Sequence, residues 1–203
     1  MSDHFKNKIK QTFLDSISVK QKIIECKSYE VLIEAGELIA NSISSGGKLL
    51  LCGNGGSAAD AQHLAAEFLV RLTSDTNRQS IPALSLAQDT STLTACINDY
   101  GSDEIFKRVF SSLASNGDIL LAITTSGNSK NIIETLKLAR ERNIYSLGFL
   151  GNGGGEALKY CNSAFVVPGK TTARIQESHI TAGHALLQYI EDLLLESGWL
   201  IKD

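Results

Sequence analysis

The stretch that decides the fold is LLLCGNGGSAADAQHLAAEFLVR, residues 49–71. It follows Lys48 with an apolar run that is typical of a buried strand. The chain then turns through residues 53–57 and continues as a helix from about Ala58. A strand that ends in glycines and leads into a helix presents free backbone N–H groups and the positive end of the helix dipole. This arrangement predicts a binding site for an anion.

The same helix carries two ionisable side chains, His63 and Glu67. Residues four positions apart lie on one helix face, about 40° apart around the axis. A histidine and a carboxylate beside an anion site indicate a small phosphorylated substrate that undergoes proton transfer. The alternative stays open that the pair only stabilises the helix surface weakly.

Composition restricts the classes of protein that this chain can belong to. A chain of 203 residues suits one domain, and 43% hydrophobic with 20% charged residues is ordinary for a globular protein. The net charge of −3 argues against a nucleic-acid partner, so a bound phosphate would be held by backbone amides and hydroxyls.

The lack of a recognisable targeting signal and the spacing of the cysteines lead us to expect a cytoplasmic protein. The N-terminus has no apolar signal core and no stretch is long enough to span a bilayer, so we expect no membrane partner. Widely spaced cysteines without a CxxC pair favour free thiols in a reducing compartment; they are Cys26, Cys52, Cys96 and Cys161.

Hydrophobic periodicity predicts an α/β fold. Residues 2–46 have the pattern of two amphipathic helices. Expected strands lie at 48–52, 81–87, 118–124, 145–150 and 163–167, and expected helices at 58–72, 90–97, 103–115, 130–143, 154–161 and 174–197. Alternating elements with near-continuous apolar strands predict one doubly wound domain with a five-stranded parallel sheet. Residues 1–46 exceed what the sheet needs for cover, so we expect this extension to pack against another copy of the chain.

A second candidate loop, residues 124–129, follows the third strand and precedes a helix. Its sequence, TTSGNS, offers four hydroxyls and a glycine. One hydroxyl, from Ser126 or Ser129, would be enough to cap the helix. Four hydroxyls at a helix N-terminus instead favour a phosphate monoester site.

Other readings of the motifs carry less weight. The pattern Gly53-x-Gly55-x-x-Ala58 fits a loose dinucleotide fingerprint, but Asp89 lies too far away to be its acidic partner. A P-loop is excluded because no Gly-Lys-Ser/Thr follows. Of two histidines in the apolar C-terminal helix, His179 and His184, the second is the better candidate for chemistry.

Together these segments resemble the sugar isomerase (SIS) superfamily and, within it, the bacterial phosphoheptose isomerases. The matching segments are CGNGGSAADAQHLAAEF at 52–68, IND at 97–99, TTSGNS at 124–129 and RIQESHITAGH at 174–184. The resemblance implies a flavodoxin-like sheet and a homotetramer with active sites between subunits. It also implies an aldose–ketose isomerase that converts sedoheptulose 7-phosphate to D-glycero-D-manno-heptose 7-phosphate through an enediol, the first step toward the heptose of lipopolysaccharide core.

The resemblance further implies roles for individual residues. Glu67 matches the general base and His184 its partner acid. The residues that match substrate contacts are Asn54, Gly55, Gly56, Ser57, Glu67, Asn98, Asp99, Thr124, Thr125, Ser126, Ser129 and Gln176. Some members hold zinc with residues that match His63, Glu67, Gln176 and His184. On one unbroken helix Gln176 and His184 would lie about 12 Å apart along the axis, so they share an ion only if Gln176 precedes the helix or comes from another copy.

Three rival functions remain. One is a non-catalytic SIS protein that binds the replication initiator DnaA, but such a relative resembles a member without the glutamate and histidine pair. Another is an isomerase of a different phosphosugar, since Ala173 stands where some members have an acidic residue. A third is a sugar-phosphate-sensing regulatory domain, for which the expected helix-turn-helix region is not evident.

Overall fold

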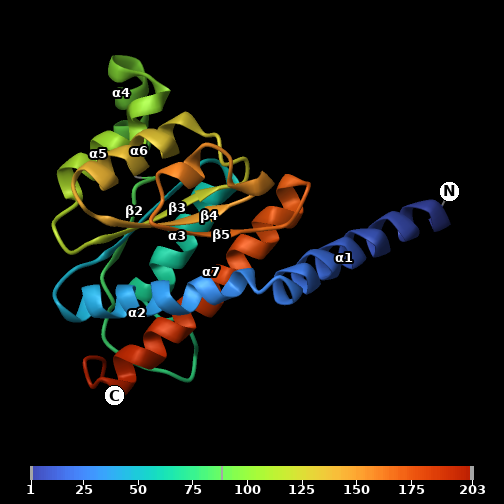
Figure 1. The fold of residues 1–203 in the computed structure, drawn as a ribbon, viewed down its shortest axis with the longest axis horizontal. Coiled ribbons are helices and arrows are strands. Elements are labelled where there is room, and N and C mark those ends of the chain that lie inside the picture. Colours follow the sequence, from blue (N-terminus) through green and yellow to red (C-terminus); the bar gives the residue numbers. More distant parts are fainter. Residues whose placement is uncertain (1, 88, 202–203) are drawn as a thin grey trace.

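A parallel sheet forms the centre of the computed structural model, which describes residues 2–87 and 89–201 (Figure 1). Its five strands are β1 Leu49–Gly53, β2 Ala83–Ser85, β3 Ile119–Thr124, β4 Tyr145–Leu150 and β5 Ser163–Val166. They lie in the order β2-β1-β3-β4-β5, and every neighbouring pair is parallel. The expected doubly wound, five-stranded parallel sheet is confirmed.

Helices cover both faces of this sheet (Figure 1). One face carries α2 Val31–Ser44, α3 Gly56–Leu69 and α7 Thr172–Glu196, and the other carries α4 Thr90–Tyr100, α5 Ile105–Leu113 and α6 Lys130–Glu141. Successive residues of a strand point to opposite faces. In β1, Leu49 and Leu51 therefore join one core, whereas Leu50 and Cys52 join the other. Both cores are apolar, which explains why the strands are near-continuous apolar runs.

The order of strands determines where a ligand can bind. The connection from β1 to β2 runs through α3 on one face, whereas the connection from β2 to β3 runs through α4 and α5 on the other. In open α/β sheets, ligands bind beyond the carboxyl ends of the strands where the order reverses. Here that point lies between β1 and β3. The loops that follow these two strands are those singled out in the sequence.

The N-terminal helix α1, Ser2–Glu25, extends away from the rest of the chain (Figure 1). Val19 and Ile23 near its C-terminal end are buried in the core. Its remaining large apolar side chains are exposed, among them Phe5, Ile9, Phe13, Leu14 and Ile17. A short 3₁₀ turn, Ser28–Glu30, then leads into α2. The two predicted N-terminal helices are thus present, and one of them exposes its apolar stripe.

The helix predicted at 154–161 is wrong. The structure has two short 3₁₀ turns instead, Asn152–Gly154 and Ala157–Lys159. The reason is that Gly153, Gly154 and Gly155 all have positive φ angles, which a right-handed helix does not accept.

Smaller features also differ from the pattern. Strand β2 begins at Ala83 and not at residue 81, because Pro82 has no N–H to donate to a ladder, and it ends at Ser85 before the predicted residue 87. A 3₁₀ turn, Ser102–Glu104, precedes α5. In the part of the chain that the structure describes, every helix is too short or too polar to cross a bilayer.

Candidate active site

The turn between β1 and α3 depends on two glycines. Gly55 has a φ of 54°, in the region that favours glycine. A Cβ on Gly53 would lie 2.4 Å from the carbonyl oxygen of Ser57, so no larger residue fits. The Ser57 amide donates to the Asn54 carbonyl at 2.9 Å, which closes the turn. The glycines of this motif therefore bring the chain sharply from the strand into the helix.

Asn54 connects this turn to the second loop. Its side-chain amide pairs reciprocally with that of Asn131, at 2.8 and 2.9 Å. Asn131 lies in the first turn of α6 and was not singled out in the sequence. Its position two residues after the hydroxyl-rich loop was the only signal available. The pair joins the two loops across the point where the strand order reverses.

The hydroxyls of residues 124–129 converge at the N-terminus of α6. Thr124 Oγ1 lies 3.3 Å from Ser126 Oγ and 3.1 Å from Ser129 Oγ. Ser129 occupies the N-cap position of α6 without a capping hydrogen bond from its side chain. Ser126 Oγ accepts from the Asn128 amide at 3.1 Å. A group of hydroxyls at a helix N-terminus is suited to bind phosphate.

A second glycine-rich loop, after β4, supports the hydroxyl loop. The Ala157 amide donates to the Gly127 carbonyl at 2.8 Å, and the Asn152 side chain donates to the Thr125 carbonyl at 3.1 Å. A Cβ on Gly127 would lie 2.2 Å from the carbonyl oxygen of Gly154. This contact was not predicted, because part of the loop has the sequence pattern of a helix.

His63, Glu67 and His184 lie together. His63 Nε2 is 2.8 Å from His184 Nε2 and 3.5 Å from Glu67 Oε1. They line a surface depression of about 500 Å³ with Leu72, Thr73 and Gln188. His63 and Glu67 come from α3, and His184 comes from α7, so the cluster joins two helices on one face of the sheet. The two residues matched to base and acid thus share one opening to solvent.

The cluster also has the donor set of a metal site. One nitrogen or oxygen from each of the three side chains lies within 4.8 Å of the other two. Two imidazoles and a carboxylate beside an open depression are typical of a catalytic transition-metal site, in which a position stays free for water or substrate. The residues present therefore fit a zinc ion.

Gln176 lies elsewhere on α7. This helix is continuous from Thr172 to Glu196, so Gln176 does not precede it and could share an ion with His184 only across copies. Instead, the Gln176 side chain packs against Gly56, where a Cβ would be 2.0 Å from its Nε2. The same amide lies close enough to the Asp60 carboxyl to lower its pKa, and Asp60 was not singled out in the sequence. Burial raises the pKa of Asp60, against the opposing effects of Gln176 and the two histidines.

His179 belongs to the core. It packs between Phe149 and Phe165, and its Nε2 lies 3.2 Å from the Leu150 carbonyl oxygen. Burial lowers its pKa to about 4, so it is neutral at pH 7. His179 is therefore a neutral core residue, whereas His184 on the same helix lines the surface depression.

Asn98 and Asp99 are not brought to the cluster within one chain. Both lie on α4, and Asn98 Nδ2 donates to Asp99 Oδ1 at 2.7 Å. Asp99 lines a different depression, of about 430 Å³, beside Tyr100 and Arg108. Part of the predicted substrate set is therefore separate from the histidines and glutamate of its own chain.

Comparisons with known proteins agree with one another. A family model described as SIS domain matches residues 12–151. Among curated relatives, the phosphoheptose isomerase of Aquifex aeolicus is 43% identical over 93% of this chain and 97% of its own. That of Campylobacter concisus is 49% identical over 78% of this chain and 82% of its own. The structure of phosphoheptose isomerase GmhA from Neisseria gonorrhoeae superposes with a TM-score of 0.85 at 39% identity, covering 93% of this chain and 99% of the other.

Proposed function

Since the chain belongs to the SIS domain family and, within it, to the phosphoheptose isomerases, we propose that it converts sedoheptulose 7-phosphate to D-glycero-D-manno-heptose 7-phosphate. This aldose–ketose isomerisation would be the first step toward the heptose of lipopolysaccharide core. The observation that carries the proposal is the meeting of Glu67 and His184 in one depression.

Each side chain has a defined part in the reaction. Glu67 takes the proton from C1 of the ketose, which leaves an enediol, and the proton returns to C2 to form the aldose. His184 moves the proton between the oxygens on C1 and C2, because an imidazole both donates and accepts. The hydroxyl loop, with Thr124, Ser126 and Ser129, holds the phosphate at the far end of the sugar.

Zinc is part of the proposal. His63, Glu67 and His184 would hold the ion, and the clustering of their ligand atoms supports this set. Gln176 would complete it only from another copy of the chain. When bound, zinc would supply a Lewis acid that stabilises the negative charge of the enediolate. Zinc binding can be measured directly by titrating chelator-treated protein and a His63→Ala variant with Zn²⁺.

We also propose that the chain forms a homotetramer through residues 1–46, with active sites between subunits. The exposed apolar stripe of α1 supports this, because Phe5, Ile9 and Phe13 are each more than half exposed, at 56%, 64% and 68%. The separation of Asp99 from the histidine cluster supports a site completed by a neighbour. The free thiols of all four cysteines favour the cytoplasm as location. Light scattering should give four times the 21.9 kDa chain mass, and the mass of one chain or of two chains would contradict the tetramer.

The isomerase proposal is tested by incubating the purified protein with sedoheptulose 7-phosphate in D₂O. We expect deuterium at C2 of a heptose 7-phosphate, detected by NMR, because the proton removed from C1 exchanges with solvent before it returns to C2. The Glu67→Gln variant should keep its circular dichroism spectrum and lose turnover by at least about 100-fold, as for the loss of a general base.

A matched control is Glu141→Gln, at the exposed C-terminal end of α6. It removes the same charge from a helix distant in sequence from the cluster and should leave turnover unchanged. A fully active Glu67→Gln variant would remove Glu67 from the mechanism. No deuterium and no aldose with the native protein would instead favour the non-catalytic alternative.

A further inference from the structure

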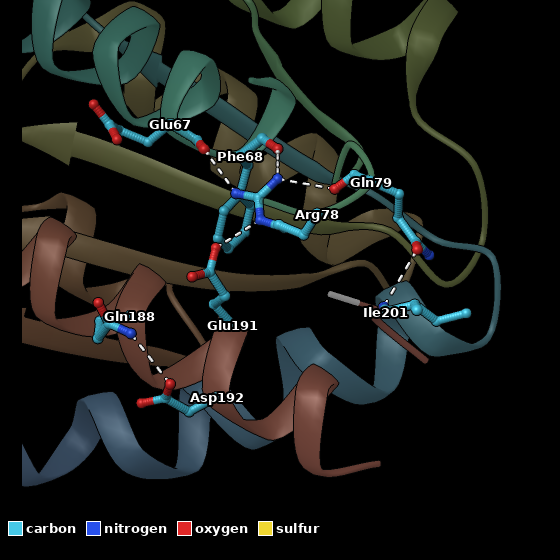
Figure 2. Close-up of polar contacts among 8 residues, drawn as sticks. All are labelled: Glu67, Phe68, Arg78, Gln79, Gln188, Glu191, Asp192 and Ile201. Atoms are coloured by element: carbon cyan, nitrogen blue, oxygen red, sulfur yellow. Dashed lines mark hydrogen bonds and ion pairs between the residues drawn. The ribbon is translucent and has the colours of Figure 1, made fainter. Parts of the chain in front are cut away.

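One arginine beside the candidate site is completely buried. Arg78 lies in the connection between α3 and β2, and its side chain is 0% exposed. Figure 2 shows its guanidinium between α3 and α7. Its hydrogen bonds run to Glu191 Oε2 at 2.6 Å, the Glu67 carbonyl at 2.9 Å, the Phe68 carbonyl at 2.9 Å and the Gln79 carbonyl at 3.0 Å.

Two of these acceptors are backbone groups at the end of α3. The helix ends at Leu69, so the carbonyls of Glu67 and Phe68 have no partner within it. A cation at this position also interacts favourably with the negative end of the helix dipole. Arg78 therefore holds the very residue, Glu67, whose carboxylate faces the depression.

The other end of the network lies on the helix of His184. Glu191 follows His184 by seven residues on α7, which puts the two on one face of the helix, about 20° apart. Gly183, next to His184, packs so tightly on α3 that a Cβ there would lie 2.7 Å from Leu64 Cδ1. The two helices are thus joined by close packing beside His184 and by the Arg78–Glu191 ion pair farther along.

Stability is a weak explanation for this pair. Burying a guanidinium and a carboxylate costs desolvation energy that their attraction often only offsets. The buried Oε1 of Glu191 has no hydrogen-bond partner among the described residues, so the pair is incompletely satisfied. A buried ion pair that gains little stability can still select one arrangement of the helices that it joins.

We propose that Arg78, anchored by Glu191, is a positioning residue that sets the distance between the Glu67 carboxylate and the His184 ring. It touches neither substrate nor reacting atoms; it acts by holding the backbone of Glu67 against α7. The role in turnover rests on the proposed isomerase function, whereas the role in geometry does not.

The first test is Arg78→Lys. Lysine keeps the charge opposite Glu191, but its ammonium cannot reach the carboxylate and the helix carbonyls in the fork geometry of a guanidinium. We expect kcat to fall by about 10- to 100-fold, the size of effect that a displacement of about 1 Å produces, with KM changed less than about threefold. The phosphate loop lies on other elements, so substrate binding should be retained.

Glu191 provides a second, independent pair of variants. Glu191→Gln keeps an oxygen that accepts from Arg78 Nε, so kcat should stay within about threefold of the native value. Glu191→Leu removes the acceptor and should reduce kcat as much as Arg78→Lys does. If Glu191→Gln keeps its kcat although it lacks the negative charge, the side chain at position 191 acts by holding Arg78 in place and not by its charge.

A matched control is the ion pair of Lys48 and Asp118. Its Nζ–Oδ2 distance is also 2.6 Å and Asp118 is 2% exposed, but it joins the starts of β1 and β3, at the edge of the sheet opposite the site. Lys48→Gln should lower the melting temperature and leave kcat unchanged.

Histidine NMR gives a readout that needs no activity. The chain has four histidines, so the ring signals of His63 and His184 can be assigned by substitution. At one fixed pH, Arg78→Lys should shift the signals of both rings, although Arg78 contacts neither ring. The signal of His4 should not move in this variant. In the Lys48→Gln control, the signals of His63 and His184 should stay at their native positions.

The outcomes separate the two proposals. An inactive native protein would overturn the isomerase function, and the NMR shifts would then decide positioning alone. A folded Arg78→Lys variant with kcat within twofold of native and unmoved signals would overturn the positioning role. If Arg78→Lys fails to fold, equal kcat for Glu191→Gln and Glu191→Leu would overturn it.

Discussion

Acidification should destabilise the protein through one buried residue, His179. Its side chain is 1% exposed, and burial lowers its pKa from 6.5 to about 4. Unfolding exposes the ring and restores the ordinary pKa. Between these two values the unfolded chain binds a proton that the folded chain does not, so stability rises with pH. The contribution of the neutral His179 ring to the free energy of unfolding is therefore complete above pH 6.5, and it is lost as the pH falls toward 4.

The size of the effect follows from the two pKa values. Each unit of pKa difference corresponds to about 1.4 kcal/mol between the protonation states. At pH 7 both states are mostly neutral, whereas at pH 5 only the unfolded state is mostly protonated. The free energy of unfolding should therefore fall by about 2 kcal/mol between pH 7 and pH 5 on account of His179.

Urea unfolding at pH 7 and pH 5, followed by circular dichroism, measures this difference. The reference is His179→Gln, which keeps an N–H that can donate to the Leu150 carbonyl but does not titrate. The native protein should lose about 2 kcal/mol more than the variant over this pH range. Equal losses would show that the ring is protonated in the folded state, which would refute the description of His179 as a neutral core residue.

Two further predictions concern glycines at the site. Gly56→Ala should displace the Gln176 side chain, because a Cβ would lie 2.0 Å from Gln176 Nε2. The far end of a flexible side chain can move, so the melting temperature should change little. The displaced amide should nevertheless lower kcat/KM by about 10-fold or more. Unchanged kcat/KM would remove Gln176 from substrate binding. Gly127→Ala meets the rigid backbone of Gly154 and a φ of 66°, so it should cost about 2 kcal/mol of stability in urea unfolding and raise the KM for the phosphosugar. Native stability would show that the two loops can separate freely.

Local patterns were sufficient to predict most of the fold. Alternating strands and helices indicated the parallel sheet, and the hydroxyl-rich loop and the His63–Glu67 spacing were visible as short motifs. The exception was residues 154–161, where side chains typical of a helix follow glycines with positive φ. Glycine accepts both positive and negative φ angles, so the presence of a glycine in the sequence does not reveal which of the two it adopts.

The sequence by itself determined which elements form and which motifs end at the carboxyl edge of the sheet, because periodicity and turn chemistry act over a few residues. Only the tertiary structure decided that His184 meets His63 across 121 positions of the chain, that Gln176 packs against Gly56 instead, and that Arg78 is buried beneath Glu67. These contacts depend on how closely α3 and α7 pack. That packing is the sum of many small, non-local interactions, none of which leaves a pattern in the sequence.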